Sequence, residues 1–189
     1  DMVLADDNFA TIVAAVEEGR RIFDNIQKVI QFLLSANLAE VIAIFVATLF
    51  GFTILKPVHL LWINLITDSI PALALGVEDP EGDLMKRKPR DPKTHVLGNR
   101  MGIDILYQGV AISILTLVSY IIGHYMEAGV WEIAQSPDGM TMAFTTLSLA
   151  EIVHSFNMRS RKNSIFTIRT VNWGLIGAAG IAIILTAGV

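Results

Sequence analysis

Five apolar stretches run along the chain, each close to the length of a membrane-spanning helix. They cover about residues 29–50, 52–76, 103–123, 140–158 and 171–189. A helix of about 20 apolar residues crosses the hydrocarbon core of a bilayer. The first, third and fifth stretches are strongly apolar, whereas the second and fourth hold more polar residues. The pattern predicts an all-α fold, a polytopic transmembrane bundle of five helices.

A helix is also predicted ahead of the first apolar stretch. Over residues 8–28, apolar side chains recur near the 3.6-residue helical spacing, with charged residues between them. Asp7 or Asn8 is the expected N-cap, and only Gly19 weakens the helix before Phe50. One helix of about 40 residues, about 60 Å long, should therefore leave the membrane as a stalk. Such a stalk either couples mechanically to a cytoplasmic domain or is a solvated amphipathic extension.

The positions of the charges predict the orientation of the bundle. Of the 14 basic residues, all but Lys56 lie on one side of the five-span arrangement, within residues 20–28, 86–100 and 159–169. The positive-inside rule therefore places the N-terminus and the two basic loops in the cytoplasm. The net charge of −4 gives no support to nucleic-acid binding. The absence of cysteine from the sequence excludes a disulfide-stapled domain and thiolate metal sites.

Carboxylate, amide and hydroxyl side chains lie inside three of the predicted spans. An ionised side chain at the centre of a bilayer costs at least about 2.5–3.5 kcal/mol, so three carboxylates at similar depth need a compensating role. Oxygen ligands of these types suit a hard cation such as Ca²⁺. The alternative is a buried hydrogen-bond network between helices. The candidate metal ligands are Asn37, Glu40, Asn64, Thr67, Asp68 and Glu151.

Pro71 lies in the second span, close to these ligands. Proline lacks an N–H, and its ring clashes with the carbonyl four residues back, which belongs to Thr67. We expect the helix to break or loosen near residues 67–69, with free carbonyls beside Asp68. Interrupted helices of this kind form ion sites in transporters. An ordinary proline kink is the alternative. The lone His154 is interpreted as a structural residue.

Three strings resemble the type II P-type ATPases, most closely the sarcoplasmic-reticulum-type Ca²⁺ pumps. They are DDNFATIVAAVEEGRRIFDNI (6–26), LLSANLAEV (33–41) and LLWINLITDSIPALALGVEDP (60–80). KRKPRDP (86–92) also fits, and SLAEIVHSFN (148–157) matches more loosely. The resemblance identifies the five spans as the family's fifth to ninth transmembrane helices. It implies that residues 1–28 are the end of the phosphorylation domain and the stalk, and that residues 29–189 are the membrane part.

The resemblance also implies two calcium sites. The first would use Asn37, Glu40, Thr67, Asp68 and Glu151. The second would share Asp68 and add Asn64, with its remaining ligands on a fourth helix that lies upstream of this sequence. The sequence leaves Mn²⁺ open as the transported ion instead of Ca²⁺. The resemblance to bacterial pumps implies an integral protein of a prokaryotic plasma membrane.

The sequence holds no DKTGT phosphorylation motif and no nucleotide-binding segment. The resemblance implies the ion-binding membrane portion of an ATP-driven cation pump, with Ca²⁺ as the expected cation, and without these motifs the chain should not hydrolyse ATP alone. ATP and Mg²⁺ would act only through the missing N-terminal, nucleotide-binding and phosphorylation domains of the same pump. The lipid bilayer is the other expected partner. The rival function is an ATP-independent secondary transporter module, coupled to protons or cations.

Overall fold

The computed structural model describes residues 8–80, 82, 84–89, 100–131, 133–160 and 170–188, and these residues form helices and turns with no β-strand. The long helices are α1 (Phe9–Leu49), α4 (Met101–Ala128), α5 (Pro137–Asn157) and α6 (Trp173–Ala187). Between α1 and α4 come α2 (Pro57–Trp62), the π-helix η1 (Ile63–Asp68), α3 (Ser69–Gly76) and the short 3₁₀ helix η2 (Leu84–Lys86). The prediction of an all-α bundle is confirmed.

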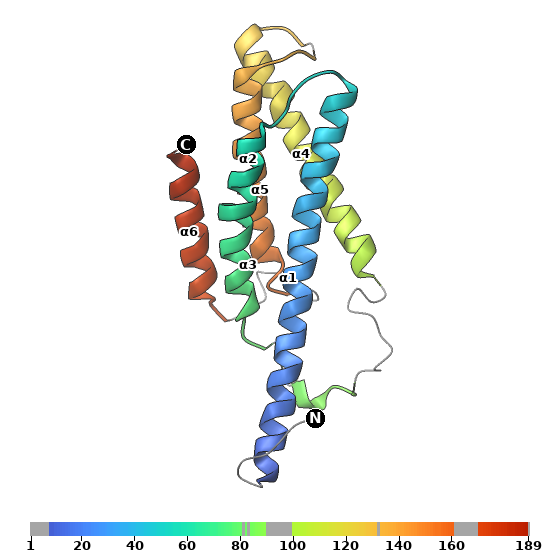
Figure 1. Cartoon of the computed structure of the whole chain (residues 1–189), viewed down its shortest axis with the longest axis vertical. Coiled ribbons are helices and arrows are strands. Elements are labelled where there is room, and N and C mark those ends of the chain that lie inside the picture. The colour runs from blue at the N-terminus through green and yellow to red at the C-terminus, as the bar shows by residue number, and fades with distance from the viewer. Residues whose placement is uncertain are drawn as a thin grey trace.

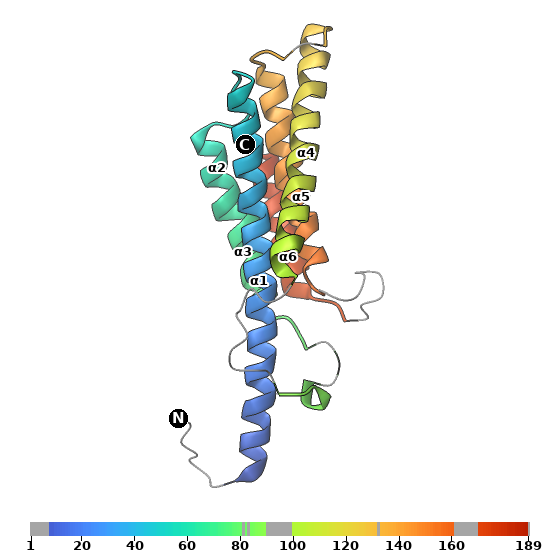
Figure 2. The same cartoon turned by 90° about the vertical axis from the view of Figure 1, so that its right-hand side faces the viewer.

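Helix α1 is the predicted stalk and first span in one piece. It has 41 residues and is therefore about 60 Å long. Asn8 is its N-cap, because the Asn8 side chain accepts a hydrogen bond from the backbone N–H of Ala10 at 3.0 Å. Figures 1 and 2 show that the N-terminal part of α1 extends well beyond the other long helices. The single long helix and its N-cap are as the sequence predicts.

The basic segment after α3 packs on this stalk. Arg20 donates through Nη1 to the carbonyls of Leu84 at 2.7 Å and Arg87 at 3.0 Å. The Arg87 guanidinium in turn forms an ion pair with Asp24 at 2.5 Å. Residues 90–99 of the predicted basic loop, and residues 161–169 of the next one, lie outside the described residues.

The second span begins later than predicted, at residue 57 instead of 52. Gly51 adopts a φ of +80°, which ends α1 in a conformation that glycine tolerates. Pro57 then occupies the first turn of α2, where a missing N–H costs nothing. Between them the chain is non-helical, although Phe52, Ile54 and Leu55 are buried. The prediction included this turn in the span because most of its residues are apolar.

The interruption in the second span is a π-helix instead of a break. Residues 63–68 form η1, and the backbone then continues as α3, so that α2, η1 and α3 follow one column in Figure 1. Two side chains of this segment bond to carbonyls of the turn before Asp68. Ser69 donates to Asn64 O at 2.7 Å, and the Thr67 hydroxyl lies 2.9 Å from Ile63 O. These bonds give the Ile63 and Asn64 carbonyls additional partners within the irregular turn.

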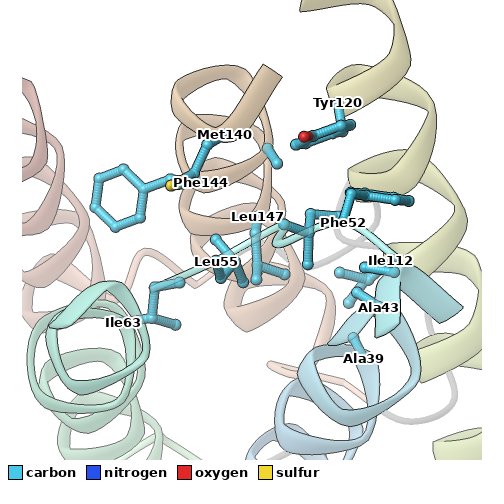
Figure 3. Close-up of a cluster of buried hydrophobic side chains, with 13 residues drawn as sticks. Ala39, Ala43, Phe52, Leu55, Ile63, Ile112, Tyr120, Met140, Phe144 and Leu147 are labelled. Carbon is cyan, nitrogen blue, oxygen red and sulfur yellow. The ribbon is translucent and has the colours of Figure 1, made fainter. Parts of the chain in front are cut away.

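The bundle core lies between α1, α4 and α5 and is closed by the α1–α2 turn. Small side chains on α1, such as Ala39 and Ala43, face Ile112 of α4 and Leu147 of α5 (Figure 3). Phe52 from the turn lies against Tyr120, with ring centroids 4.5 Å apart. This packing fixes α1 against α5 and so fixes two of the helices that carry candidate ligands.

Three helical segments are long and apolar enough to cross a membrane, namely Phe9–Leu49, Pro57–Gly76 and Met101–Ala128, as judged over the described residues. Trp173–Ala187 is apolar but shorter. Helix α5 has 21 residues and a more polar composition. Large apolar side chains such as Phe45 and Leu73 are exposed on the bundle surface, as suits helices that face lipid or other helices. The count of five spans stays a prediction.

Candidate ion-binding site

The candidate ligands come from three neighbouring elements of the bundle. Helix α1 carries Asn37 and Glu40, η1 carries Asn64, Thr67 and Asp68, and α5 carries Glu151. The middle element is the π-helix, and irregular helical turns of this type are frequent at functional sites. The three carboxylates are buried, at 6% exposure for Glu40, 1% for Asp68 and 0% for Glu151.

Glu40 and Asn64 connect α1 to the π-helix. The Asn64 amide donates through Nδ2 and lies 3.1 Å from both carboxylate oxygens of Glu40. The same nitrogen lies 2.9 Å from the carbonyl of Leu60, one turn earlier. These contacts all use the Asn64 side-chain nitrogen, so the side-chain oxygen is the atom that can act as a cation ligand. This pair therefore aligns one carboxylate and one amide oxygen on facing helices.

Thr67 and Glu151 make the matching connection between the π-helix and α5. The fully buried Thr67 hydroxyl lies 3.2 Å from Oε2 of Glu151 and 2.9 Å from the carbonyl of Ile63. The other Glu151 oxygen, Oε1, has no hydrogen-bond partner in the described part of the chain. A buried carboxylate with an unused oxygen is costly and calls for a further partner.

Asp68 is the least satisfied of the three carboxylates. Both its oxygens are buried, and neither has a hydrogen-bond partner within the described ranges. The charge of Glu40 acts on Asp68, and Glu151 interacts electrostatically with both. Three negative groups within electrostatic reach of one another repel each other unless a cation or protons compensate them. The donor set is all oxygen, which fits a hard cation.

Asn37 is not brought together with the other five residues. Its side chain is exposed and donates to the carbonyl of Leu33, on its own helix, at 2.7 Å. No group of three or more His, Cys, Asp or Glu side chains lies close enough to hold a metal ion, as far as the structure describes the chain. The arrangement thus supplies unpaired oxygens near one another, and a cation would need these ligands to close further around it.

Sequence reasoning missed a second buried polar contact on the same helices. His154 lies with Nε2 at 2.8 Å from the hydroxyl of Ser35, and its ring centroid is 5.8 Å from that of Phe32. The contact joins α5 to α1 about one turn from Glu151, in keeping with a structural role for His154. Ser35 also bonds to backbone carbonyls of α1, so its type alone gave no signal of the pairing.

Comparison with known proteins gives the family. A family described as "Cation transporting ATPase, C-terminus" matches residues 52–189. A "Calcium-transporting ATPase 1" of Bacillus cereus is 46% identical over 179 residues, which are 89% of this chain and 20% of that protein. A "Calcium-transporting ATPase" of Bacillus subtilis is 42% identical over 186 residues, which are 97% of this chain and again 20% of the relative.

The chain therefore spans about a fifth of the length of these two relatives. The family match covers the π-helix, α5 and α6, and the relatives extend the similarity into α1. With the match covering most of the sequence, this chain belongs to the cation-transporting ATPase C-terminal family.

Proposed function

We propose that this chain is the ion-binding membrane portion of an ATP-driven Ca²⁺ pump. The observation that carries the proposal is Asp68 in the π-helix, whose two buried oxygens have no hydrogen-bond partner among the described residues. The Glu40–Asn64 and Thr67–Glu151 pairs involve two further residues of the same π-helix. The names of the two Bacillus relatives support Ca²⁺ as the cargo.

In this proposal the chain binds the ion and the rest of the pump supplies the energy. Asp68 is the central ligand, while Glu40, Asn64, Thr67 and Glu151 complete one side of the coordination shell. Asn37 joins from the exposed face of α1 once an upstream helix covers that face. ATP and Mg²⁺ act in the phosphorylation and nucleotide-binding domains, and α1 transmits their movement because one uninterrupted helix runs from the stalk to Glu40.

We place the chain in the plasma membrane of a prokaryote as five transmembrane helices, with the N-terminus and both basic loops in the cytoplasm. The one-sided distribution of Lys and Arg supports this orientation. The apolar character of three long helices supports membrane insertion.

The direct test is Asp68→Asn in the full-length pump, reconstituted in vesicles. The substitution keeps the side-chain shape and removes the charge that would hold a divalent cation, so Ca²⁺-dependent ATP hydrolysis and Ca²⁺ uptake should both fall to background. Asp138→Asn is the matched control, because Asp138 is exposed at the start of α5, and this variant should retain activity within about twofold.

Full Ca²⁺-dependent activity in Asp68→Asn would refute the site. Uptake by the unmodified protein that is driven by a proton gradient and needs no ATP would instead favour the secondary transporter. Running the same uptake assay with Mn²⁺ decides between the two hard cations: faster transport of Mn²⁺ at equal concentration would refute Ca²⁺ as the preferred cargo.

A further inference from the structure

A second buried charged cluster lies outside the ion site, where the inner ends of several helices meet. Glu78 follows α3 and is only 4% exposed. Arg159, just beyond the end of α5, donates to Oε1 of Glu78 through Nη2 at 2.8 Å and Nε at 3.1 Å. A buried ion pair gives little net stability compared with apolar packing, whereas loss of one partner alone is strongly destabilising.

The other oxygen of Glu78 is used as well. It accepts a hydrogen bond from the side-chain amide of Asn172, the N-cap of α6. The same amide nitrogen lies 3.3 Å from the carbonyl of Ala74, and the Asn172 oxygen caps α6 by accepting from Leu175 N at 2.8 Å. One carboxylate thus joins the ends of α3, α5 and α6.

The stalk takes part through Asn25. This α1 residue is 3% exposed, and its side-chain amide lies 2.8 Å from the carbonyl of Glu78 and 3.2 Å from that of Gly76. Carbonyls at a helix C-terminus have no partner within the helix, so Asn25 supplies one to the end of α3. A movement of α1 would therefore act directly on the backbone of Glu78.

The ion pair and the ion site connect the same two parts of the bundle at two different heights. These two helical columns are the α2–η1–α3 segment and α5. At 1.5 Å per helical residue, Glu78 lies about 15 Å along the chain from Asp68, and Arg159 lies about 12 Å from Glu151. Thr67 and Glu151 form the contact inside the bundle, and Glu78 and Arg159 form the contact at its inner end. Both contacts therefore depend on the register of the same two parts of the bundle.

We propose that Glu78 and Arg159 form a positioning pair, which sets the register of the two ligand-bearing helices and links that register to the stalk through Asn25. This inference rests on the proposed function for its effect on Ca²⁺. The pair does not touch the ion. It acts on affinity by holding Asp68 and Glu151 at the separation that the cation requires.

The test is Glu78→Gln in the full-length pump. The amide keeps the size of the side chain but leaves Arg159 without its counter-charge, so the apparent affinity for Ca²⁺ should fall about tenfold. The maximal ATPase rate at saturating Ca²⁺ should stay within about twofold, because no ligand has been lost. Glu18→Gln is the matched control: it removes the carboxylate of the exposed Glu18–Arg21 pair and should change neither quantity.

A double variant separates positioning from folding. Glu78→Leu with Arg159→Met replaces both charges by apolar groups, which should restore thermal stability to that of the unmodified pump. Ca²⁺ affinity should stay low in this variant, since apolar contacts do not fix the register. Recovery of both stability and affinity would overturn the proposal, because the pair would then serve folding alone.

A distance measurement tests the register whatever the transported ion. Spin labels on the exposed Leu73 of α3 and Val153 of α5 report the separation of the two columns in the full-length protein. The distance distribution should shift or broaden in Glu78→Gln and remain unchanged in Glu18→Gln. An unchanged distribution in Glu78→Gln would overturn the positioning role, whereas a missing Ca²⁺ response in the unmodified pump would count only against the proposed function.

Discussion

At the scale of single residues, the Thr67 hydroxyl serves two acceptors. Its oxygen lies within hydrogen-bond distance of the Ile63 carbonyl and of the Glu151 carboxylate, yet a hydroxyl carries one hydrogen. The hydroxyl therefore shares its one hydrogen bond between the two acceptors, and its oxygen lone pairs stay available to a cation. Thr67 thus links the π-helix to α5, and the proposed function also makes its oxygen a ligand.

Thr67→Val should lower the apparent Ca²⁺ affinity of the full-length pump about tenfold. Valine has nearly the same shape but no hydroxyl, so the cation loses an oxygen ligand and Glu151 loses its donor, and a hydrogen bond to a charged group contributes about 1.5–3 kcal/mol. The measurement is ATPase activity against free Ca²⁺. Thr67→Ser keeps the hydroxyl and should respond like the unmodified pump, whereas equal affinity in the valine variant would contradict the role.

Six polar residues were predicted as ligands from the sequence, and the structure links five of them; that they bind an ion stays a prediction. Glu40, Asn64, Thr67, Asp68 and Glu151 are joined by hydrogen bonds or by electrostatic interaction. The direction of Asn37 was not predictable, since a polar residue on a helix can face a neighbour or bond back to its own backbone. The Glu78–Arg159 pair was also missed, because two residues 81 positions apart give no local signal.

At the scale of helices, α4 and α5 approach most closely where two glycines face each other's backbones. A Cβ added to Gly123 would lie 2.9 Å from the Asp138 carbonyl oxygen and from the Cα of Gly139. A Cβ on Gly139 would lie 2.8 Å from the carbonyl oxygen of Tyr120. Small residues allow such close backbone packing between membrane helices. This crossing holds the C-terminal end of α4 against the N-terminal end of α5.

Gly123→Ala should destabilise the pump by about 1–3 kcal/mol, because the methyl group meets backbone that cannot rotate away. Thermal unfolding of the detergent-solubilised full-length protein measures the loss. Gly177→Ala on α6 is the matched control, since a Cβ there meets nothing within 4 Å, and it should leave the unfolding temperature unchanged or slightly raised. Equal stability of the two variants would show that the crossing can relax.

Element positions followed from the sequence more closely than element ends. The length and the N-cap of α1 were predicted because an amphipathic period and an apolar run join with no strong breaker between them. The start of α2 was wrong by a turn, because buried apolar residues in a loop have the same composition as a span. The π-helix was predicted only as a break or loosening near Pro71, since residue types did not show that the Ser69 side chain would bond back to the Asn64 carbonyl.

At the scale of the whole molecule, the placement of the described basic residues supports the proposed orientation. The described basic residues Arg20, Arg87 and Arg159 all lie towards the stalk end of the chain's fold, where their contacts are with α1, η2 and Glu78. Lys56 caps the start of α2 at the opposite end of the second column. The structure therefore has one basic end and one end that is poor in bases.

Cysteine labelling should confirm this orientation. The chain contains no cysteine, so an introduced Ala128→Cys or Lys88→Cys is the only thiol within it. Both positions are exposed. In intact cells that express the full-length pump without its other cysteines, a membrane-impermeant maleimide should label the Ala128→Cys protein at once. The Lys88→Cys protein should react only after lysis, and the reverse order would contradict the assigned topology.

The π-helix has a consequence for how one chain could alternate between two states. A π turn closes hydrogen bonds over five residues where an α turn closes them over four, so a change from one pattern to the other adds or removes one residue in the turn. Each residue added or removed in this way corresponds to a rotation of about 100° while the rest of the segment stays wound. Asp68 sits at the end of such a turn, so the carboxylate could be swung to another side of the span without melting it.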